Sequence, residues 1–357
     1  MVALRYSIML LCIIIPIVYS FKVGISEKRT KLFILLTFIV MTVSLVMTII
    51  PPIAGNFSDA RRLSNVESFK NVEVLFKIKE INQNSRSIIA IPEVAFHFSE
   101  EEKIIDNQTS INVNNIIDLK DLESGDVVVG LVAYDNTNDE YNMSEILSIN
   151  PLLTYPFIEA LKHRIKNLNL HVPLHWTSFI AYLVSLIFSI KFLRKGNYEN
   201  DIIASSAIRI GLIFTILGTV TGMIWAKFNW GAYWNWDPRQ TTILVIMLIY
   251  FAYFGLRNSL DSKEKRAKLS AVYSIISFIS VPVLMFIIPR LLPSLHPGGD
   301  NDGTTGPVIS TQADMVDSSL AFVFYLSIAA FILLYFWLLS IDSRSKLLEN
   351  KIRESNV

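Results

Sequence analysis

The chain has 357 residues, of which 52% are hydrophobic and only 18% charged, and its mean hydropathy is +0.44. This composition excludes an ordinary soluble domain and predicts a polytopic membrane protein. The single cysteine, Cys12, lies in an apolar run, so the chain has neither a disulfide framework nor a C-x-x-C motif. Lys and Arg (32) nearly balance Asp and Glu (31), so only the placement of charges is informative, and nucleic acid is not an expected partner.

Seven segments are apolar over the roughly 20 residues that a helix needs to cross a bilayer. In chain order they are residues 5–21, 32–53, 177–193, 206–226, 241–257, 270–289 and 318–340. Basic residues follow the first segment without a small-residue cleavage site, so we interpret it as a retained helix rather than a signal peptide. The predicted fold class is therefore a polytopic α-helical membrane protein with about seven transmembrane helices.

Lys and Arg cluster after the first, third, fifth and seventh segments. All four clusters fall on one side of the membrane when the segments are threaded in order, and the positive-inside rule makes that side cytoplasmic. We therefore expect an integral protein of the plasma or inner membrane. Residues 54–173, the loop around residue 235 and the loop 290–317 are predicted to lie on the outer, extracytoplasmic face.

Residues 54–150 are polar and Asn-rich, and they contain five short runs of alternating apolar residues that read as strands. The runs are residues 72–79, 87–95, 110–113, 127–133 and 146–149. They predict an inserted small β-rich domain on the extracytoplasmic side, with an OB-like barrel as one option and docking as its expected role.

The remaining boundaries follow from the apolar segments and the charges. Residues 1–53 hold the two N-terminal transmembrane helices, and residues 151–173 form an interfacial segment. Within that segment, residues 151–170 predict an amphipathic helix lying at the membrane surface. Residues 174–340 form the main membrane domain, and residues 341–357 form a cytoplasmic tail.

The stretch NWGAYWNWDPRQT at 229–241 places three tryptophans within seven residues, beside the predicted ends of two spans. His171 and His175, in LHVPLHWTS, stand at the entrance of the third span, and His296, in PSLHPGG, stands just beyond the sixth. Imidazole is a common ligand of heme iron, and aromatic rings pack on the apolar heme macrocycle. The guanidinium of Arg239 matches the carboxylate of a heme propionate. Tryptophan and tyrosine also gather at membrane interfaces without any ligand. Three tryptophans within seven residues are, however, more than such an interfacial belt requires.

The stretch WGAYWNWDPRQT resembles the W-G-x-x-W-x-W-D (WWD) signature of heme-handling proteins of cytochrome c biogenesis, the CcmC, CcsA and CcmF family. LHVPLHWTS and SLHPGG resemble the flanking histidine contexts of its CcmC branch. The resemblance covers residues 32–53 and 165–340, and it implies a non-covalent b-type heme with His171 and His296 as its two iron ligands. The heme-contacting residues that it implies are Trp230, Gly231, Tyr233, Trp234, Trp236, Asp237 and Arg239.

Three features depart from the CcmC pattern. His175 stands where that pattern has a small residue, and we do not expect it to be a ligand. Pro238 is more typical of the CcsA and CcmF branches, whereas Arg239 fits CcmC, so the branch stays open. The 54–150 insertion is foreign to CcmC, and its end resembles the OB-fold heme chaperone CcmE. Asn150 stands nearest the place of that chaperone's heme-binding histidine, which indicates docking rather than covalent attachment.

The function that the resemblance implies is delivery of heme for cytochrome c maturation, by ligation and release rather than by catalysis. The expected partners are a heme chaperone or apocytochrome c, other membrane components of cytochrome c maturation, and membrane lipid. Alternatives are a subunit of a CcsA-type synthetase or, less favoured, a b-type electron-transfer protein. Both predict further histidines inside the helices, whereas all five histidines lie outside the predicted spans. A transporter without heme would need ionisable residues within the spans, and none is convincing.

Overall fold

The computed structural model describes residues 14–16, 18, 30–64, 70–93, 108–114, 117–157, 162–296 and 318–355. The chain divides into a compact unit formed mainly by Val46–Ile165 and a helical unit formed by the segments on both sides of it. Most of the first predicted span, 5–21, lies outside the described residues, so the count of seven transmembrane helices stays a prediction.

Six helices among the described residues are long and apolar enough to cross a membrane, which makes the chain an integral membrane protein with a helical membrane unit. The helices of this unit are α2 (Thr30–Ile49), α4 (Leu168–Lys195), α5 (Tyr198–Trp230), α6 (Pro238–Asn258), α7 (Lys263–Pro282) and α9 (Ser318–Ser355). Helix α7 continues through the π-helical turn η4 (Val283–Ile287) into α8 (Ile288–Leu291). Pro282 lacks a backbone N–H, which explains the change of hydrogen-bonding pattern at this point. The six segments predicted between residues 32 and 340 are confirmed as helices.

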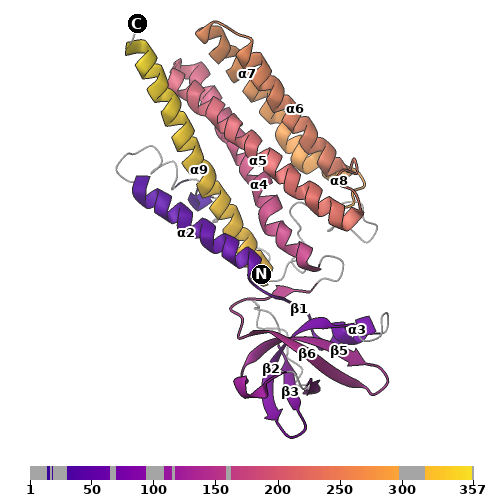
Figure 1. Cartoon of the computed structure of the whole chain (residues 1–357). Helices are drawn as coiled ribbons and strands as arrows, with labels where there is room; N and C mark the ends of the chain where they lie inside the picture. Colours follow the sequence, from indigo (N-terminus) through magenta and orange to yellow (C-terminus); the bar gives the residue numbers. More distant parts are fainter. Residues whose placement is uncertain are drawn as a thin grey trace. The chain divides into compact units, whose positions relative to one another are not determined.

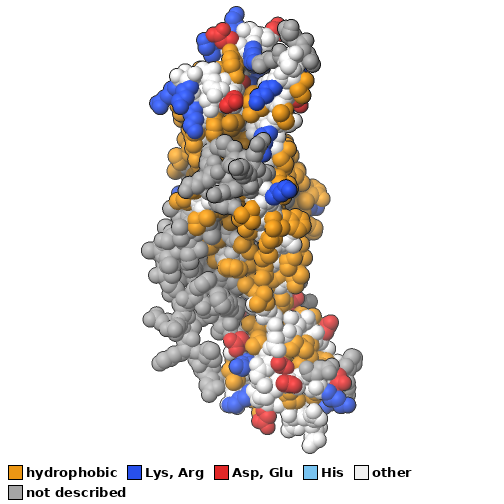
Figure 2. Space-filling view, turned by 90° about the vertical axis from the view of Figure 1, so that its left-hand side faces the viewer, with side chains coloured by type: hydrophobic (Ala, Val, Ile, Leu, Met, Phe, Trp, Pro, Cys, Tyr) orange, Lys and Arg blue, Asp and Glu red, His pale blue; other side chains and the backbone are white. Residues whose placement is uncertain are grey.

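Helices α4 and α5 lie at the centre of the helical unit, with α2 and α9 on one side and α6 and α7 on the other (Figure 1). Phe188, Phe214 and Phe331 belong to an apolar cluster that joins α4 and α5 to α9. A second cluster joins them to α6 and α7, and in it the rings of Tyr182 and Tyr250 stack 3.8 Å apart. Hydrophobic side chains cover much of the visible face of these helices (Figure 2), as a lipid environment requires.

The start of α4 differs from the prediction. The apolar pattern predicts a span from residue 177, but the helix begins at Leu168, so His171 and His175 lie inside it. The expectation that all five histidines lie outside the spans is therefore wrong for these two. Pro173 stands inside the helix, at its sixth residue, where its missing N–H removes one intrahelical hydrogen bond.

The predicted amphipathic helix over 151–170 is also wrong within the described residues. Residues 151–157 are extended and include β7 (Tyr155–Pro156), and the 3₁₀ turn η3 (Lys162–Asn167) leads directly into α4. Pro156 pushes Tyr155 toward extended backbone, which opposes a continuous helix here. Strand β7 pairs in parallel with β1 (Ile53–Ala54), so the chain enters and leaves the Val46–Ile165 unit side by side.

The Val46–Ile165 unit contains a closed barrel with the strand order β2-β3-β4-β6-β5. The strands are β2 (Val72–Asn82), β3 (Ser87–Pro92), β4 (Thr109–Val113), β5 (Val127–Asp135) and β6 (Glu140–Ile149). The pairing of β4 with β6 is parallel, and the other four pairings are antiparallel. The short helix α3 (Phe57–Ser64) packs Phe57 against Phe76 and Tyr141. All five predicted strands are present, although β6 begins six residues before the apolar run that predicts it.

A buried ion pair between α5 and α6 provides a test of this helix packing. The guanidinium of Arg257 donates two hydrogen bonds, of 2.8 and 2.7 Å, to the carboxylate of Asp201, and both side chains are at most 15% exposed. Asp201→Ala leaves the guanidinium buried without its partner, so we expect the free energy of unfolding to fall by about 3–5 kcal/mol. Thermal or denaturant unfolding of the detergent-solubilised protein measures this change.

The exposed pair of Glu264 and Lys268, 2.6 Å apart on α7, provides the control for this experiment. Glu264→Ala is expected to change the stability by less than about 1 kcal/mol, because solvent screens an exposed pair. A loss in Asp201→Ala no larger than that in Glu264→Ala would contradict the packing of α5 on α6.

Candidate functional site

The loop between α5 and α6 is fixed by its own backbone and polar side chains. Gly231 ends α5 with a φ of +83°, a left-handed conformation that favours glycine. Trp236 adopts a φ of +55°, which is uncommon for a residue with a side chain and indicates local strain. The amide of Gln240 donates to the carbonyl of Tyr233, and its side-chain oxygen accepts from the backbone N–H of Asn235 at 2.9 Å. The loop is therefore held in one shape by contacts within itself.

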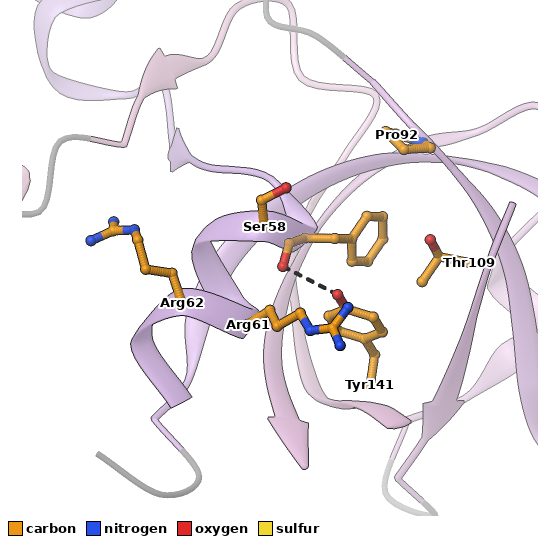
Figure 3. Close-up of a pocket in the computed structure, with 7 residues that line it drawn as sticks. Ser58, Arg61, Arg62, Pro92, Thr109 and Tyr141 are labelled. Carbon is orange, nitrogen blue, oxygen red and sulfur yellow. Dashed lines mark hydrogen bonds between the residues drawn. The ribbon is translucent and has the colours of Figure 1, made fainter. Parts of the chain in front are cut away.

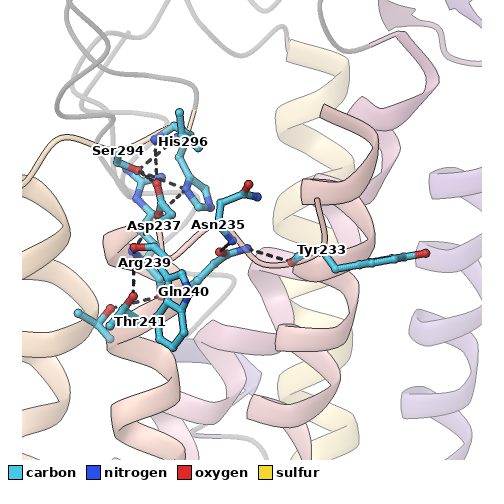
Figure 4. A network of polar contacts seen from close by, with 11 residues as sticks. Tyr233, Asn235, Asp237, Arg239, Gln240, Thr241, Ser294 and His296 are labelled. Carbon is cyan, nitrogen blue, oxygen red and sulfur yellow. Dashed lines mark hydrogen bonds and ion pairs between the residues drawn. The ribbon is translucent and has the colours of Figure 1, made fainter. Parts of the chain in front are cut away.

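The carboxylate of Asp237 is the centre of a polar network (Figure 4). One oxygen accepts from the backbone N–H of Arg239 at 2.9 Å, which caps the N-terminus of α6, and lies 3.0 Å from Nδ1 of His296. The other oxygen accepts from the hydroxyl of Ser294 at 2.9 Å and from the backbone N–H of Leu295 at 2.8 Å. A single side chain therefore starts α6 and holds the segment after α8 in place.

The electrostatics of this network favour a carboxylate beside a neutral imidazole. Burial raises the pKa of the Asp237 carboxyl, but hydrogen bonds from His296 and from the backbone amides of Leu295 and Arg239 hold that pKa well below its ordinary value. Burial lowers the pKa of His296, and its hydrogen bond to Asp237 offsets that shift only in part. The carboxylate accepts a hydrogen bond from the Nδ1–H of a neutral His296, which leaves the lone pair of Nε2 available to a ligand.

Two tryptophan rings pack on the imidazole of His296. The ring of Trp225 lies nearly parallel to it, with centroids 5.9 Å apart, and the ring of Trp230 meets it at 72° and 4.8 Å. Trp225 and Trp230 also contact each other edge to face at 5.0 Å. The end of α5 thus surrounds His296 with aromatic surface, and the side chain of His296 is only 18% exposed.

Two glycines of α5 make room for the imidazoles of α4. A methyl group on Gly222 would lie 2.6 Å from Cε1 of His171, and one on Gly218 would lie 2.8 Å from Cε1 and Nε2 of His175. The Nδ1 atom of His171 lies 2.9 Å from the carbonyl oxygen of Gly218. A carbonyl only accepts, so Nδ1 carries the proton and Nε2 of His171 keeps its lone pair.

Charged and imidazole groups converge at this end of the helical unit. His171 lies within electrostatic range of both His296 and Arg239, and His175 lies within range of His171 and His296. The Nε and Nη2 atoms of Arg239 are buried without a hydrogen-bond partner among the described residues. This arrangement fits heme, a planar iron macrocycle that carries carboxylates. It offers two imidazoles with free Nε2 atoms, an arginine with unused donors and several indole rings.

The predicted site residues do not all lie together. The structure brings His296, Asp237 and Trp230 into contact, and it places Arg239 beside them through its backbone. Tyr233, Trp234 and Trp236 are on the same loop, but Tyr233 points away from the network (Figure 4) and Trp236 is 70% exposed. The rings of Trp234 and Trp236 pack edge to face on each other at 5.7 Å. Gly231 serves the backbone turn that ends α5.

Sequence reasoning missed four residues of this arrangement. Trp225 lies inside an apolar span, where a tryptophan is unremarkable, and Ser294 is a common loop residue. Gly218 and Gly222 carry the one usable signal, a G-x-x-x-G spacing in an apolar helix, which is typical of close helix packing. That spacing does not reveal that the facing residues are histidines.

The barrel unit contains a separate cavity of about 450 Å³ (Figure 3). Its lining residues are Phe57, Ser58, Arg61, Arg62, Pro92, Thr109 and Tyr141, and none of them is a histidine. The hydroxyl of Tyr141 donates to the carbonyl of Phe57 at 3.3 Å. This lining does not provide the imidazole pair that the helical unit contains.

Comparison with known proteins points to one family. Residues 157–357 match the protein family described as "Heme exporter protein C" (CcmC). The chain is 25% identical over 188 residues to "Heme exporter protein C" of Paracoccus denitrificans (strain Pd 1222), covering 53% of this chain and 75% of that protein. It is 28% identical over 189 residues to the protein of the same name from Bradyrhizobium diazoefficiens, covering 53% of this chain and 69% of that protein. It is also 32% identical over 120 residues to "Cytochrome c biogenesis protein CcsA" of Fagopyrum esculentum subsp. ancestrale, covering 33% of this chain and 36% of that protein.

Replacing Asp237 tests its central place in the network. Asp237→Ala removes the cap of α6 and the acceptor of the Leu295 amide, so we expect faster hydrogen exchange at residues 294–296 and in the first turn of α6. Loss of the cap alone should cost about 1 kcal/mol. Hydrogen–deuterium exchange with peptide resolution measures both effects.

Asn197→Ala is the matched control, because the Asn197 side chain caps α5 by accepting from the N–H of Glu199 at 2.8 Å. This variant should speed exchange at the start of α5 and leave residues 294–296 unchanged. Unchanged exchange at Leu295 in Asp237→Ala would show that the carboxylate does not hold that segment.

Proposed function

We propose, from the premise that this chain belongs to the heme exporter protein C (CcmC) family, that it holds heme at the outer face of the membrane and delivers it for cytochrome c maturation. Family membership places the chain in the heme handling of cytochrome c biogenesis. The outer face, the iron ligands and the delivery step are our inference from the residues of the helical unit.

The hydrogen bonding of the two histidines carries this proposal. Nδ1 of His171 is held by the carbonyl of Gly218, and Nδ1 of His296 is held by the carboxylate of Asp237. Metal-bound histidines usually donate their second ring N–H to a carbonyl or a carboxylate in this way. We assign Nε2 of His171 and His296 as the two axial ligands of a non-covalent b-type heme.

The other polar and aromatic groups take supporting roles in this assignment. Arg239 has buried donors without partners among the described residues, and a guanidinium pairs well with a propionate. Trp225 and Trp230 fix the plane of the His296 ring and exclude water from it. Trp234 and the exposed Trp236 and Tyr233 provide an apolar rim beside the macrocycle or toward an acceptor protein.

The orientation follows from the basic residues. Lys and Arg gather in the C-terminal parts of α4 and α9 and around the turn between α6 and α7, at the ends remote from the α5–α6 loop. The positive-inside rule therefore favours a cytoplasmic location for those ends and an extracytoplasmic location for the loop and His296. On this account heme is bound where apocytochrome c or a heme chaperone could receive it.

We assign the barrel to the OB-like class and give it a docking role. The strand order β2-β3-β4-β6-β5, with its one parallel pairing between β4 and β6, supports a five-stranded Greek-key barrel of that kind. Asn150 lies at its last strand, and its side chain donates to Asp126 and accepts from the N–H of Val127. These contacts support a structural role for Asn150 and a barrel that binds partners without covalent heme.

Delivery is favoured over a CcsA-type synthetase, although His171 and His175 lie inside α4. A synthetase of that type is expected to have a second histidine pair within its helices. With His171 and His296 assigned, His175 is the one further histidine in a membrane-spanning helix, because His97 and His163 precede α4. The membrane-spanning helices that the structure describes therefore hold too few histidines for a second pair, and release of heme to a partner is the simpler role.

Removing the loop histidine tests the ligand assignment. Wild-type protein loaded with ferric heme in nanodiscs is expected to give a six-coordinate, low-spin spectrum. In His296→Ala one axial bond is lost, so the spectrum should become five-coordinate or high-spin, and His171→Ala with His296→Ala should retain little heme. His97→Ala is the control and should match wild type. An unchanged spectrum in the double variant would overturn the assignment.

Arg239 is expected to recognise the carboxylates of heme. Arg239→Leu should weaken heme binding about tenfold or more, because a charge-assisted hydrogen bond contributes roughly 1.5–3 kcal/mol. The same variant should bind heme dimethyl ester, which lacks the carboxylates, as well as wild type does. Titration of both compounds into apoprotein measures the difference. Equal loss of affinity for heme and for its ester would contradict a propionate contact.

A further inference from the structure

We propose that His175 is a second iron ligand on α4, which takes the iron of heme when His171 releases it. This inference rests on the proposed function, and it assigns a role to a residue that the family pattern does not explain. It depends on the position of His175, on the contacts of its ring and on the chemistry of imidazole.

The positions of the two rings make an exchange feasible. His175 follows His171 by about one helical turn, so their Cα atoms are separated by about 6 Å along the axis. Both rings face α5, where Gly218 and Gly222 leave space for them. Their centroids lie 4.9 Å apart, and the ring planes meet at 85°. The two imidazoles therefore reach the same space from the same helix.

The hydrogen bonding of His175 differs from that of its neighbour. Nδ1 of His171 is held by the carbonyl of Gly218. The ring of His175 also interacts with the Gly218 backbone, but its Nδ1 atom is buried with no hydrogen-bond partner in the described part of the chain. A buried polar atom without a partner is unfavourable, so an apolar or small residue would pack here more favourably. Binding of a metal ion by His175 accounts for an imidazole at this place.

The exchange needs no further reactant. The bond between iron and Nε2 of His171 breaks, and a bond between iron and a ring nitrogen of His175 forms. Each bond is donated by an imidazole lone pair, so no electron is transferred and the iron keeps its oxidation state. His171 keeps its hydrogen bond to Gly218, and His296 remains the second ligand. His175 thus keeps the iron six-coordinate while His171 is free.

Single and double variants separate His175 from His171. Full-length protein in nanodiscs is loaded with ferric heme, and its spin state is read by absorption and electron paramagnetic resonance spectroscopy. His171→Ala is expected to stay six-coordinate and low-spin, with His175 in place of the lost ligand. His171→Ala with His175→Ala is expected to become five-coordinate or high-spin, and His175→Ala alone should keep the wild-type spectrum.

A high-spin spectrum in His171→Ala that equals that of the double variant would overturn the proposal. His171→Gln serves as a second variant if alanine disturbs folding, because an amide can still donate to the Gly218 carbonyl but ligates iron poorly. Added imidazole should restore the low-spin spectrum of the double variant, which shows that its pocket is intact. Failure of the proposed function would give a different result from failure of this inference. Either the wild-type protein would bind no heme, or His296→Ala would show the same spectrum as wild type.

Discussion

The site depends on the carboxylate of Asp237. It caps α6, accepts a hydrogen bond from the backbone of Leu295 and accepts another from the ring of His296, so two segments that are far apart in the chain meet at one side chain. A buried carboxylate is stable only when such donors surround it. Here the hydrogen bonds from Ser294 and Leu295 to this carboxylate position the neighbouring His296. The cap that Asp237 forms at the start of α6 also fixes the end of the α5–α6 loop. On the proposed assignment, Asp237 therefore acts as a positioning residue for His296.

The close approach of α4 and α5 provides the other half of the site. Gly218 and Gly222 let the backbone of α5 approach within reach of two imidazoles, and the carbonyl of Gly218 fixes the tautomer of His171. Small residues at i and i+4 are usual where membrane helices pack closely. In this protein the space that they leave is occupied by histidines, so the packing motif also shapes the ligand site. Helix α5 then continues to Trp225 and Trp230, which connects the two halves.

Local signals account for what the sequence could predict. The six apolar spans between residues 32 and 340, the five strands and the loop at 229–241 are encoded in neighbouring residues, and each is found as an element of the fold. The early start of α4 was missed because Asn, His and Pro residues interrupt the apolar pattern of its first turns. The bond between Asp237 and His296 was also missed, because it joins residues on different elements. Trp225 carried no signal, since its role appears only when His296 lies against it.

The most direct test of the account is an experimental structure of the heme-loaded protein in a lipid nanodisc. We predict iron bonded to Nε2 of His171 and Nε2 of His296, at the roughly 2 Å usual for a metal–imidazole bond. Nδ1 of each ring should remain hydrogen-bonded, to Gly218 and Asp237 respectively. Iron bonded away from His296, or a His296 ring that has left Asp237 in the loaded protein, would contradict the account.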